Sequence, residues 1–323
     1  MSSPNPLNPG FNGRTNPVAF KPAPQPPLVM GVVNVTPDSF SDGGQFLDVN
    51  AAIAHGRDLI DEGAQIIDVG AESTRPGASP IDEATELARA IPVVAALAPH
   101  IRVSIDTVKP TVAEAAVAAG ATLINDVSAS LAPVAARLGV GWVAMHSRGT
   151  PATMQSLVDY EDVVGEVCEF LRLKAEEAER LGVEEIWVDP GIGFAKTGLQ
   201  NVKLLANLDA LCSLGWPVLV GTSRKRFLGQ LLAESDAAGA ARARAARPES
   251  TKTAGVSGNL DDRVSSVGND DLPVDLVNVA ERLEGSIATV TWALASGASM
   301  VRVHDVSASV EAVSVVAGSI NEH

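Results

Sequence analysis

The sequence predicts an α/β protein whose single domain is an eight-stranded (β/α)8 barrel. Two observations carry this prediction: eight apolar runs that each end in polar or charged residues, and helical segments that alternate with them. Such alternation is typical of a parallel sheet covered by helices. An open doubly wound sheet and a closed barrel both fit it. The eight strand–helix pairs, and the lack of a glycine fingerprint after the first run, favour the barrel.

The first strand is the apolar run at residues 28–33, which ends abruptly at Asn34 in a polar loop. Strands buried on both faces have continuous apolar runs of this kind. The other seven strands are the runs in QIIDVGAESTRPG, RVSIDT, TLINDVSA, WVAMHS, IWVDPGIGF, VLVGTSRK and MVRVHDV. Catalytic groups of such barrels lie at the C-terminal ends of the strands, so the eight polar endings predict one shared site.

Segments with helical spacing separate the strands. They cover residues 49–62, 81–97, 110–119, 132–138, 160–181, 201–214, 274–296 and 305–319, with a short extra helix near 226–232. Residues 1–27 are rich in Pro and Asn and lack the apolar core of a signal peptide, so we expect a flexible leader before a barrel spanning residues 28–320.

One segment interrupts the alternation of strands and helices. Residues 233–272, after the seventh strand, are small and polar. Such a composition buries too little apolar surface to offset the entropy of ordering it. We expect a flexible insertion here rather than a lid that takes part in catalysis.

Composition narrows the class of protein. A hydrophobic fraction of 46% over 323 residues supplies a large core, and a formal charge of −15 argues against nucleic acid or an anionic membrane as partner. No apolar run is long enough to cross a bilayer. The only cysteines, Cys168 and Cys212, are isolated, which favours a reducing compartment and a cytoplasmic protein.

Acidic and amide side chains end three of the predicted strands: Asp106 in SIDT, Asn125 in INDV and Asp189 in WVDPG. A carboxylate in such a place is costly unless it is paired. A flat heterocycle that displays adjacent N–H and NH₂ donors would pair with these groups. Each Asp alone could instead cap the helix that follows it, but the three together favour a binding site.

Further residues complete this expected pocket. Lys225, beyond strand seven, could reach a ring carbonyl or ring nitrogen, and Phe194 and Met145 offer apolar faces for the ring. At strand eight, Arg302 and His304 lie two positions apart, so their side chains share one face and predict a phosphate site. His304 taken alone would more often be a structural hydrogen-bonding residue.

Asn34 and Thr74 join the predicted phosphate site. The Asn34 oxygen could help to hold a Mg²⁺ ion that already carries phosphate and water ligands. Two long loops, residues 36–44 and 72–78, follow strands one and two and carry Phe40 and Arg75. A simple connection would not need Phe and Arg at its tip, whereas a lid that closes over substrates would.

The motifs NVTPDSFSDGG, ESTRPGA, SIDT, INDVS, DPGIGF, SRK and RVHDV resemble those of the dihydropteroate synthase family, which sulfonamides target, from Leu28 to Ser319 apart from the insertion. The resemblance implies a (β/α)8 barrel, usually a homodimer. It implies an enzyme that joins 4-aminobenzoate to 6-hydroxymethyl-7,8-dihydropterin diphosphate with the help of Mg²⁺.

The resemblance also implies a role for each matching residue. The pterin pocket would be Asp106, Asn125, Met145, Asp189, Phe194 and Lys225. Diphosphate and Mg²⁺ would bind at Asn34, Thr74, Arg302 and His304. The aminobenzoate would lie among Phe40, Thr74, Arg75, Pro76, Ser223 and Lys225, with Asp42 on the closing first loop. The residues expected to act in catalysis are Asp42, Asp106, Lys225, Arg302 and His304.

The implied chemistry needs no catalytic triad, because diphosphate can leave before the neutral arylamine attacks, and catalysis is then positioning plus electrostatics. One departure from the family pattern is Arg226, where many members have Ser; it could bind the aminobenzoate carboxylate or point away from it.

Two rival classes remain. A pterin-binding methyltransferase module would share the carboxylates but would have no use for Arg302, His304 or the two loops. A non-enzymatic relative should show decay in SRK, RVH or NVTPDSF, and all three are intact. The synthase is therefore favoured.

Overall fold

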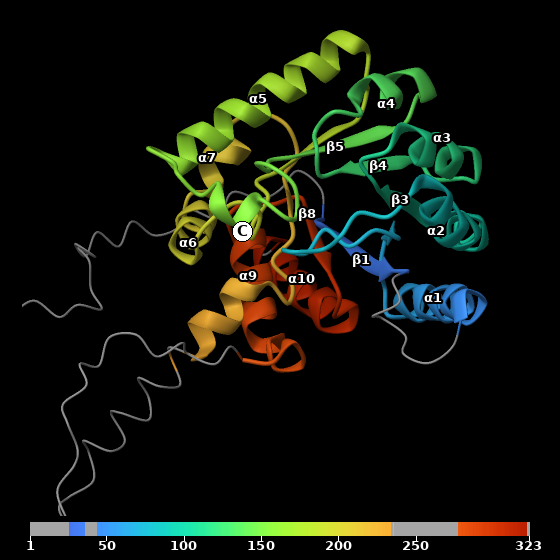
Figure 1. The fold of residues 1–323 in the computed structure, drawn as a ribbon. Coiled ribbons are helices and arrows are strands. Elements are labelled where there is room, and N and C mark those ends of the chain that lie inside the picture. Colours follow the sequence, from blue (N-terminus) through green and yellow to red (C-terminus); the bar gives the residue numbers. More distant parts are fainter. Residues whose placement is uncertain (1–25, 36–43, 234, 236–276, 322–323) are drawn as a thin grey trace, which may run out of the picture.

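The computed structural model describes residues 26–35, 44–233, 235 and 277–321 (Figure 1). Three expectations made from the sequence therefore fall wholly or largely outside the described residues. They are the leader up to residue 25, the insertion from residue 236 onward, and the first loop with Phe40 and Asp42.

Eight parallel strands form the centre of the molecule, as the sequence predicts. They are β1 (Leu28–Asn34), β2 (Ile66–Gly70), β3 (Arg102–Asp106), β4 (Leu123–Asp126), β5 (Gly141–Met145), β6 (Ile186–Asp189), β7 (Leu219–Val220) and β8 (Met300–Val303). The strand order is β6-β5-β4-β3-β2-β1-β8-β7. A parallel bridge between Val188 and Val218 joins the two outer strands, which closes the sheet into a barrel.

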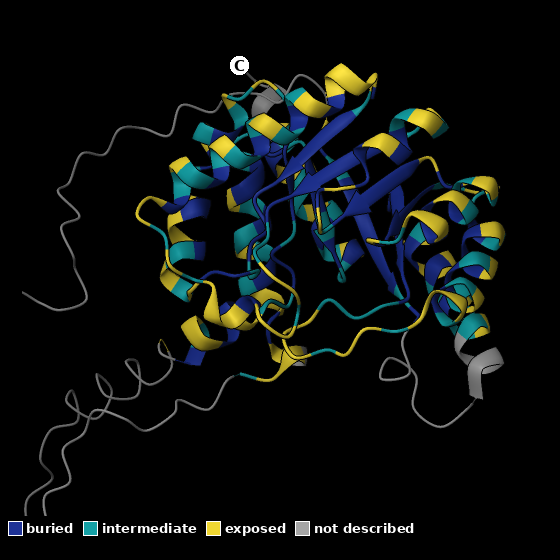
Figure 2. Cartoon of the chain, turned by 45° about the horizontal axis from the view of Figure 1, so that its top comes forward, coloured by how far each residue is buried: buried dark blue, intermediate teal, exposed yellow. Residues whose placement is uncertain are grey.

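Helices surround the barrel and turn their exposed faces outward (Figure 2). They are α1 (Gly44–Asp61), α2 (Glu83–Leu97), α3 (Pro110–Ala118), α4 (Ala132–Leu138), α5 (Val163–Leu181), α6 (Gly198–Ala206), α7 (Leu208–Cys212), α9 (Leu283–Ala295) and α10 (Val306–Asn321). Residues 226–233 are also helical. Among the described residues, no helix is long and apolar enough to cross a membrane.

Two helix predictions were wrong in their bounds. The expected helix over 201–214 is divided into α6 and α7 at Asn207, whose side-chain Nδ2 donates to the Lys203 carbonyl at 2.7 Å and so competes with the helical pattern. The helix expected from residue 274 is a 3₁₀ turn at Val279–Glu281 followed by α9. Here Arg282 Nε donates to the Val277 carbonyl at 2.9 Å and holds the chain in a turn.

The barrel interior has an apolar lower layer and, nearer the C-terminal ends of the strands, a polar upper layer. The lower layer is Met30, Ile66, Leu123, Val143, Trp187, Leu219 and Met300. Side chains of a strand alternate between its two faces, so the residue two positions later also points inward. Those next positions are largely polar: Asp68 after Ile66, Asn125 after Leu123, Asp189 after Trp187 and Arg302 after Met300. The alternation therefore places the polar groups together at the C-terminal end of the barrel.

Candidate active site

A cavity opens at the C-terminal ends of the strands. Its lining is Thr74, Asp106, Asn125, Val127, Met145, Asp189, Gly191, Ile192, Phe194, Gly221, Lys225 and Arg302. All six residues expected to form the heterocycle pocket are in this set, together with Thr74 and Arg302 from the expected phosphate group.

Arg302 is the centre of a buried ion cluster. Its Nε donates to Asp68 Oδ2 at 2.6 Å, and its Nη2 donates to Asp106 Oδ2 at 2.8 Å. Asn125 Nδ2 donates to the same Asp68 oxygen at 2.9 Å. Asp68 is fully buried. One carboxylate thus orients both a cation and an amide of the cavity lining.

Asp68 was missed by the sequence reasoning, which considered only the residues that end strands. Asp68 lies in the middle of β2, two residues before the strand ends. Its signal was a charged residue within the otherwise apolar run IIDVG. A buried charge of this kind predicts a partner, although the partner itself, far away in the chain, cannot be read from the run.

The carboxyl groups of the cavity are costly to ionise. Burial raises the pKa of Asp106 to about 7, despite the opposing charge of Arg302. Burial also raises the pKa of Asp189, whose Oδ1 accepts the Gly191 N–H at 2.7 Å. A ligand that donates hydrogen bonds to these oxygens would favour their ionised forms.

Lys225 lines the same cavity. Its Nζ is 4.2 Å from the centre of the Phe194 ring. Burial, and then the charge of Arg302, lower the pKa of Lys225 to about 8. An ammonium over an aromatic face, close to buried carboxylates, is set to donate to one edge of a flat ring.

The turn that carries Lys225 is fixed from several sides. Arg224 has a positive φ of 59°, and its guanidinium pairs with Asp305, with 2.5 Å between Nη2 and Oδ1. The Arg224 N–H donates to Ser286 Oγ at 3.0 Å, and its carbonyl accepts from Arg282 Nη1 at 3.0 Å. These long-range contacts hold a strained backbone in place just before Lys225. None of them was predicted from the sequence.

Lys196 fixes the loop that carries Phe194. Its buried Nζ contacts the carbonyls of Gly191 at 3.1 Å and Phe194 at 3.0 Å, and His146 Nδ1 at 2.9 Å. Burial lowers the pKa of Lys196 to about 7 and that of His146 to about 3. A neutral imidazole can therefore accept from the ammonium, which ties the loops after β5 and β6 together.

His304 follows β8 and is held by Ser223. The Ser223 Oγ accepts the His304 backbone N–H at 3.2 Å and lies 3.1 Å from Nδ1 of the same residue. Burial, and then the charge of Arg302, lower the pKa of His304 to about 3, so the ring is neutral. If the hydroxyl donates to Nδ1, the ring proton is on Nε2 and is available to a ligand.

Four other predicted residues, Asn34, Arg75, Pro76 and Arg226, do not line the cavity. Asn34 ends β1 and is half-buried, and Pro76 and Arg226 are exposed. Arg75 is also exposed, but its charge contributes to the lowered pKa of Lys225, after burial and nearer charges. Among the described residues, no three His, Cys, Asp or Glu side chains gather as a metal cluster.

Known proteins are similar to this chain in sequence and in fold. The profile of a family described as pterin binding enzymes matches residues 30–304. A dihydropteroate synthase of Synechocystis is 40% identical over 289 residues, which are 87% of this chain and 86% of the relative. One of Mycobacterium leprae is 43% identical over 300 residues, or 90% of this chain and 93% of the relative. The structure of the Xanthomonas albilineans dihydropteroate synthase with 4-aminobenzoic acid has a TM-score of 0.74 at 40% identity, covering 91% of this chain and 93% of that chain.

Proposed function

The chain belongs to the pterin binding enzyme family, and we infer that within it the chain catalyses the dihydropteroate synthase reaction of folate biosynthesis. The substrates are 6-hydroxymethyl-7,8-dihydropterin diphosphate and 4-aminobenzoate, and the products are 7,8-dihydropteroate and diphosphate. The observation that carries this conclusion is the single cavity that brings Asp106, Asn125, Asp189 and Lys225 together beside Arg302.

We propose that the pterin ring binds in this cavity. The carboxylates of Asp106 and Asp189 and the side-chain oxygen of Asn125 accept hydrogen bonds along the ring edge that carries N–H and NH₂ groups. Lys225 donates to the opposite edge, which carries the ring carbonyl. Phe194 and Met145 offer apolar side chains against which the ring can lie.

The diphosphate is proposed to lie toward Arg302, His304 and Asn34. Arg302 already donates to Asp68 and Asp106, so its remaining nitrogen, Nη1, is the one left for a phosphate oxygen. The neutral His304 ring donates from Nε2. Arg302 therefore joins the pterin and diphosphate subsites, whereas the sequence had placed it with the diphosphate alone.

The donor set also fits a Mg²⁺ ion that arrives with the diphosphate. Asn34 supplies one neutral oxygen at the end of β1, and Mg²⁺ commonly takes one or two protein ligands with waters and substrate phosphates for the rest. When bound, the ion offsets the negative charge of the leaving diphosphate.

Catalysis then consists of positioning and charge stabilisation. The bond between the pterin methylene carbon and the diphosphate oxygen breaks, and its electron pair leaves with the diphosphate. Asp106 and Asp189 stabilise the positive charge left on the pterin. The amine nitrogen of 4-aminobenzoate uses its lone pair to form the new C–N bond and then releases a proton to solvent.

The second substrate is proposed to bind between the cavity mouth and the loop after β2. Thr74 lines the cavity, and Arg75 and Pro76 follow it on this loop. Ser223 and Lys225 face it from the turn after β7. Arg226 begins the helix at residues 226–233, where backbone N–H groups and its own charge favour the carboxylate of 4-aminobenzoate. Phe40 and Asp42 stay predictions.

We also propose that the enzyme is a cytoplasmic homodimer. The sequence has only two cysteines, Cys168 and Cys212, which lie far apart in the chain, and this usage is typical of a reducing compartment. Helices α6 and α9 pack together and expose Leu199, at 82% of its surface, and Trp292, at 47%. Large apolar side chains exposed on neighbouring helices are typical of an interface. Sedimentation of Leu199→Glu beside the parent protein tests it, and identical masses would exclude this interface.

An assay of diphosphate release from the purified protein tests the reaction. We expect release from the dihydropterin diphosphate that is stimulated by 4-aminobenzoate and matched mole for mole by dihydropteroate. A methyltransferase module or a non-enzymatic relative would bind the pterin and release no diphosphate.

A further inference from the structure

The loop between β2 and α2, residues 72–81, has no regular secondary structure, yet it carries Thr74 into the cavity lining. Arg75, Pro76 and Gly77 at its centre are exposed. A segment with so few buried contacts needs some other constraint to hold a binding geometry. One constraint is the hydrogen bond from the Gly77 N–H to the Pro151 carbonyl at 2.9 Å, and a second lies at the two ends of the loop, outside the cavity.

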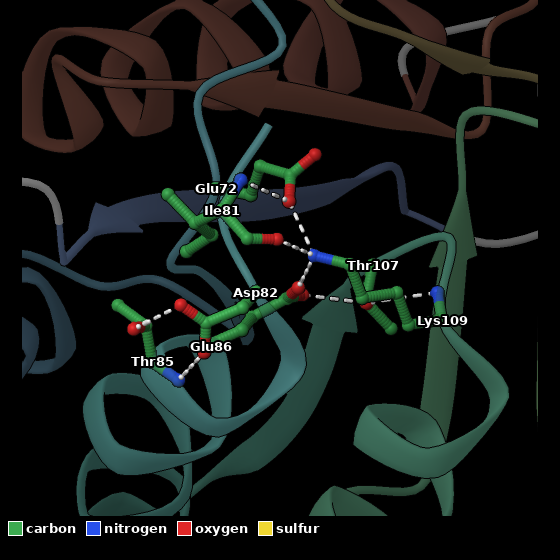
Figure 3. A network of polar contacts seen from close by, with 7 residues as sticks. All are labelled: Glu72, Ile81, Asp82, Thr85, Glu86, Thr107 and Lys109. Carbon is green, nitrogen blue, oxygen red and sulfur yellow. Dashed lines mark hydrogen bonds and ion pairs between the residues drawn. The ribbon is translucent and has the colours of Figure 1, made fainter. Parts of the chain in front are cut away.

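Lys109, which precedes α3, contacts both ends of this loop (Figure 3). Its Nζ donates to the carboxylate of Glu72, where the loop begins, and to the carbonyl of Ile81, where it ends, at 2.7 Å. Glu72 Oε2 in turn accepts the Ile81 N–H at 3.3 Å. The pair of Lys109 and Glu72 thus binds both backbone groups of Ile81 and closes the loop at its base.

The same ammonium is anchored to the barrel. Lys109 Nζ lies 2.5 Å from Glu86 Oε2 on α2, and Glu86 Oε1 accepts from Thr107 Oγ1 at 2.6 Å. Thr107 follows Asp106, which pairs with Arg302 in the cavity. Burial lowers the pKa of Lys109, but its bonds to Glu72 and Glu86 outweigh this and raise the pKa above the ordinary value. The ammonium therefore stays charged.

We propose that Lys109 is a positioning residue for the second substrate, acting through the 72–81 loop; the proposal rests on the proposed function. Closing the loop at its base removes conformations that the loop would otherwise lose on binding 4-aminobenzoate. Lys109 touches neither substrate. It fixes where Thr74 and Arg75 lie relative to Lys225, and a displacement of about 1 Å in such groups can cost about 100-fold in rate.

The test compares Lys109→Met, which removes the charge at similar length, with Lys109→Arg, which keeps it. Arg137→Met is the matched control, because it breaks the exposed ion pair between Arg137 and Glu114 on the outer helices. We expect Lys109→Met to raise the KM for 4-aminobenzoate at least tenfold and to change the Kd of a dihydropterin less than twofold. Lys109→Arg should recover most of the loss, and Arg137→Met should behave as the parent.

A purely stabilising role for Lys109 predicts a different pattern. The melting temperature would fall while both KM values of the folded enzyme stayed at the parent level, and that result would overturn the proposal. If Lys109→Met does not fold, Glu72→Gln takes its place, since it weakens the same ion pair and keeps an acceptor for Ile81. The same rise in KM is expected for it, and an unchanged KM again overturns the proposal.

Hydrogen exchange separates this inference from the proposed function. The Gly77 N–H donates to the Pro151 carbonyl at 2.9 Å and the Ala78 N–H to the Arg75 carbonyl at 3.0 Å, so both amides report the closed loop without any substrate. Lys109→Met should speed their exchange at least tenfold. If the parent protein had no synthase activity but Lys109→Met still exchanged these amides faster, only the proposed reaction would be refuted. If exchange were unchanged in Lys109→Met, only the positioning role of Lys109 would be refuted.

Discussion

Arg302 and Asp68 form a buried ion pair across the barrel interior, with Nε and Oδ2 2.6 Å apart although the residues are 234 positions apart in the chain. The pair places a cation at the end of β8 in one orientation before any substrate arrives. A guanidinium that is already oriented loses little freedom when it meets a phosphate. Asp68, in the middle of β2, therefore fixes the orientation of the Arg302 guanidinium at the C-terminal ends of the strands.

Asp68→Asn should impair both stability and catalysis. The change leaves Arg302 with one carboxylate and less compensation for its burial, so the free energy of unfolding should fall by about 3 kcal/mol. We expect kcat/KM to fall at least tenfold because Arg302 loses its orientation. Urea unfolding and steady-state kinetics measure the two effects.

Ser104→Ala is the control for this change. Ser104 is paired with Asp68 across β2 and β3, it is buried, and its hydroxyl makes no hydrogen bond within the described residues. Its removal should change stability little and leave kcat/KM at the parent level. Parent-like kinetics for Asp68→Asn would show that Arg302 does not depend on Asp68.

Asp189→Ala and Lys225→Ala should each weaken pterin binding while the barrel still folds. Hydrogen bonds to charged groups contribute about 1.5–3 kcal/mol, so we expect at least a tenfold rise in Kd by calorimetry. Circular dichroism should show a folded protein in both cases. Tight pterin binding by either variant would refute the pocket.

Pterin affinity should depend on pH and be highest between the pKa of Asp106 and the pKa of Lys225. Burial, opposed by the charge of Arg302, sets the pKa of Asp106 at about 7, and burial followed by Arg302 sets that of Lys225 at about 8. The ligand favours ionised Asp106, so affinity rises with pH through the lower value. It also favours charged Lys225, so affinity falls above the upper value.

Calorimetric titration from pH 6 to 9 measures this dependence, after correction for the ionisation of the free ligand. An affinity that stays constant over this range would contradict the proposed contacts to Asp106 and Lys225.

Arg226→Ser tests the recognition of 4-aminobenzoate. Arg226 is exposed at the start of the helix over residues 226–233, where its charge can meet the substrate carboxylate. We expect the KM for 4-aminobenzoate to rise about tenfold and the KM for the pterin substrate to stay constant. Rising salt should reduce the difference between parent and variant, because exposed charges are screened. An unaltered KM would show that Arg226 points away from this substrate.

The sequence predicted the barrel because its signals are local. Apolar runs followed by polar residues correspond to the strands, which are two to seven residues long. The alternation of inward and outward side chains places Asn125, Asp189 and Arg302 in one layer. A parallel sheet needs little more than this pattern to be recognised. Helix bounds were less predictable, because Asn207 and Arg282 use side-chain bonds to end or delay a helix.

The supporting contacts of the site could not be predicted from the sequence alone. Lys109 meets Glu72, 37 positions earlier, and Arg302 meets Asp68, 234 positions earlier. Nothing in the local pattern of either residue names its partner, since each pairing depends on how the barrel closes. The resemblance to a family supplied the candidates for substrate contact and was silent on the groups that hold these candidates in place.

A crystal structure with bound 6-hydroxymethyl-7,8-dihydropterin tests the central claim most directly. The account predicts that the ring lies among Asp106, Asn125, Asp189 and Lys225, with its methylene group directed toward Arg302 and His304. A ring bound at any other place, or a methylene group directed away from Arg302, would contradict it.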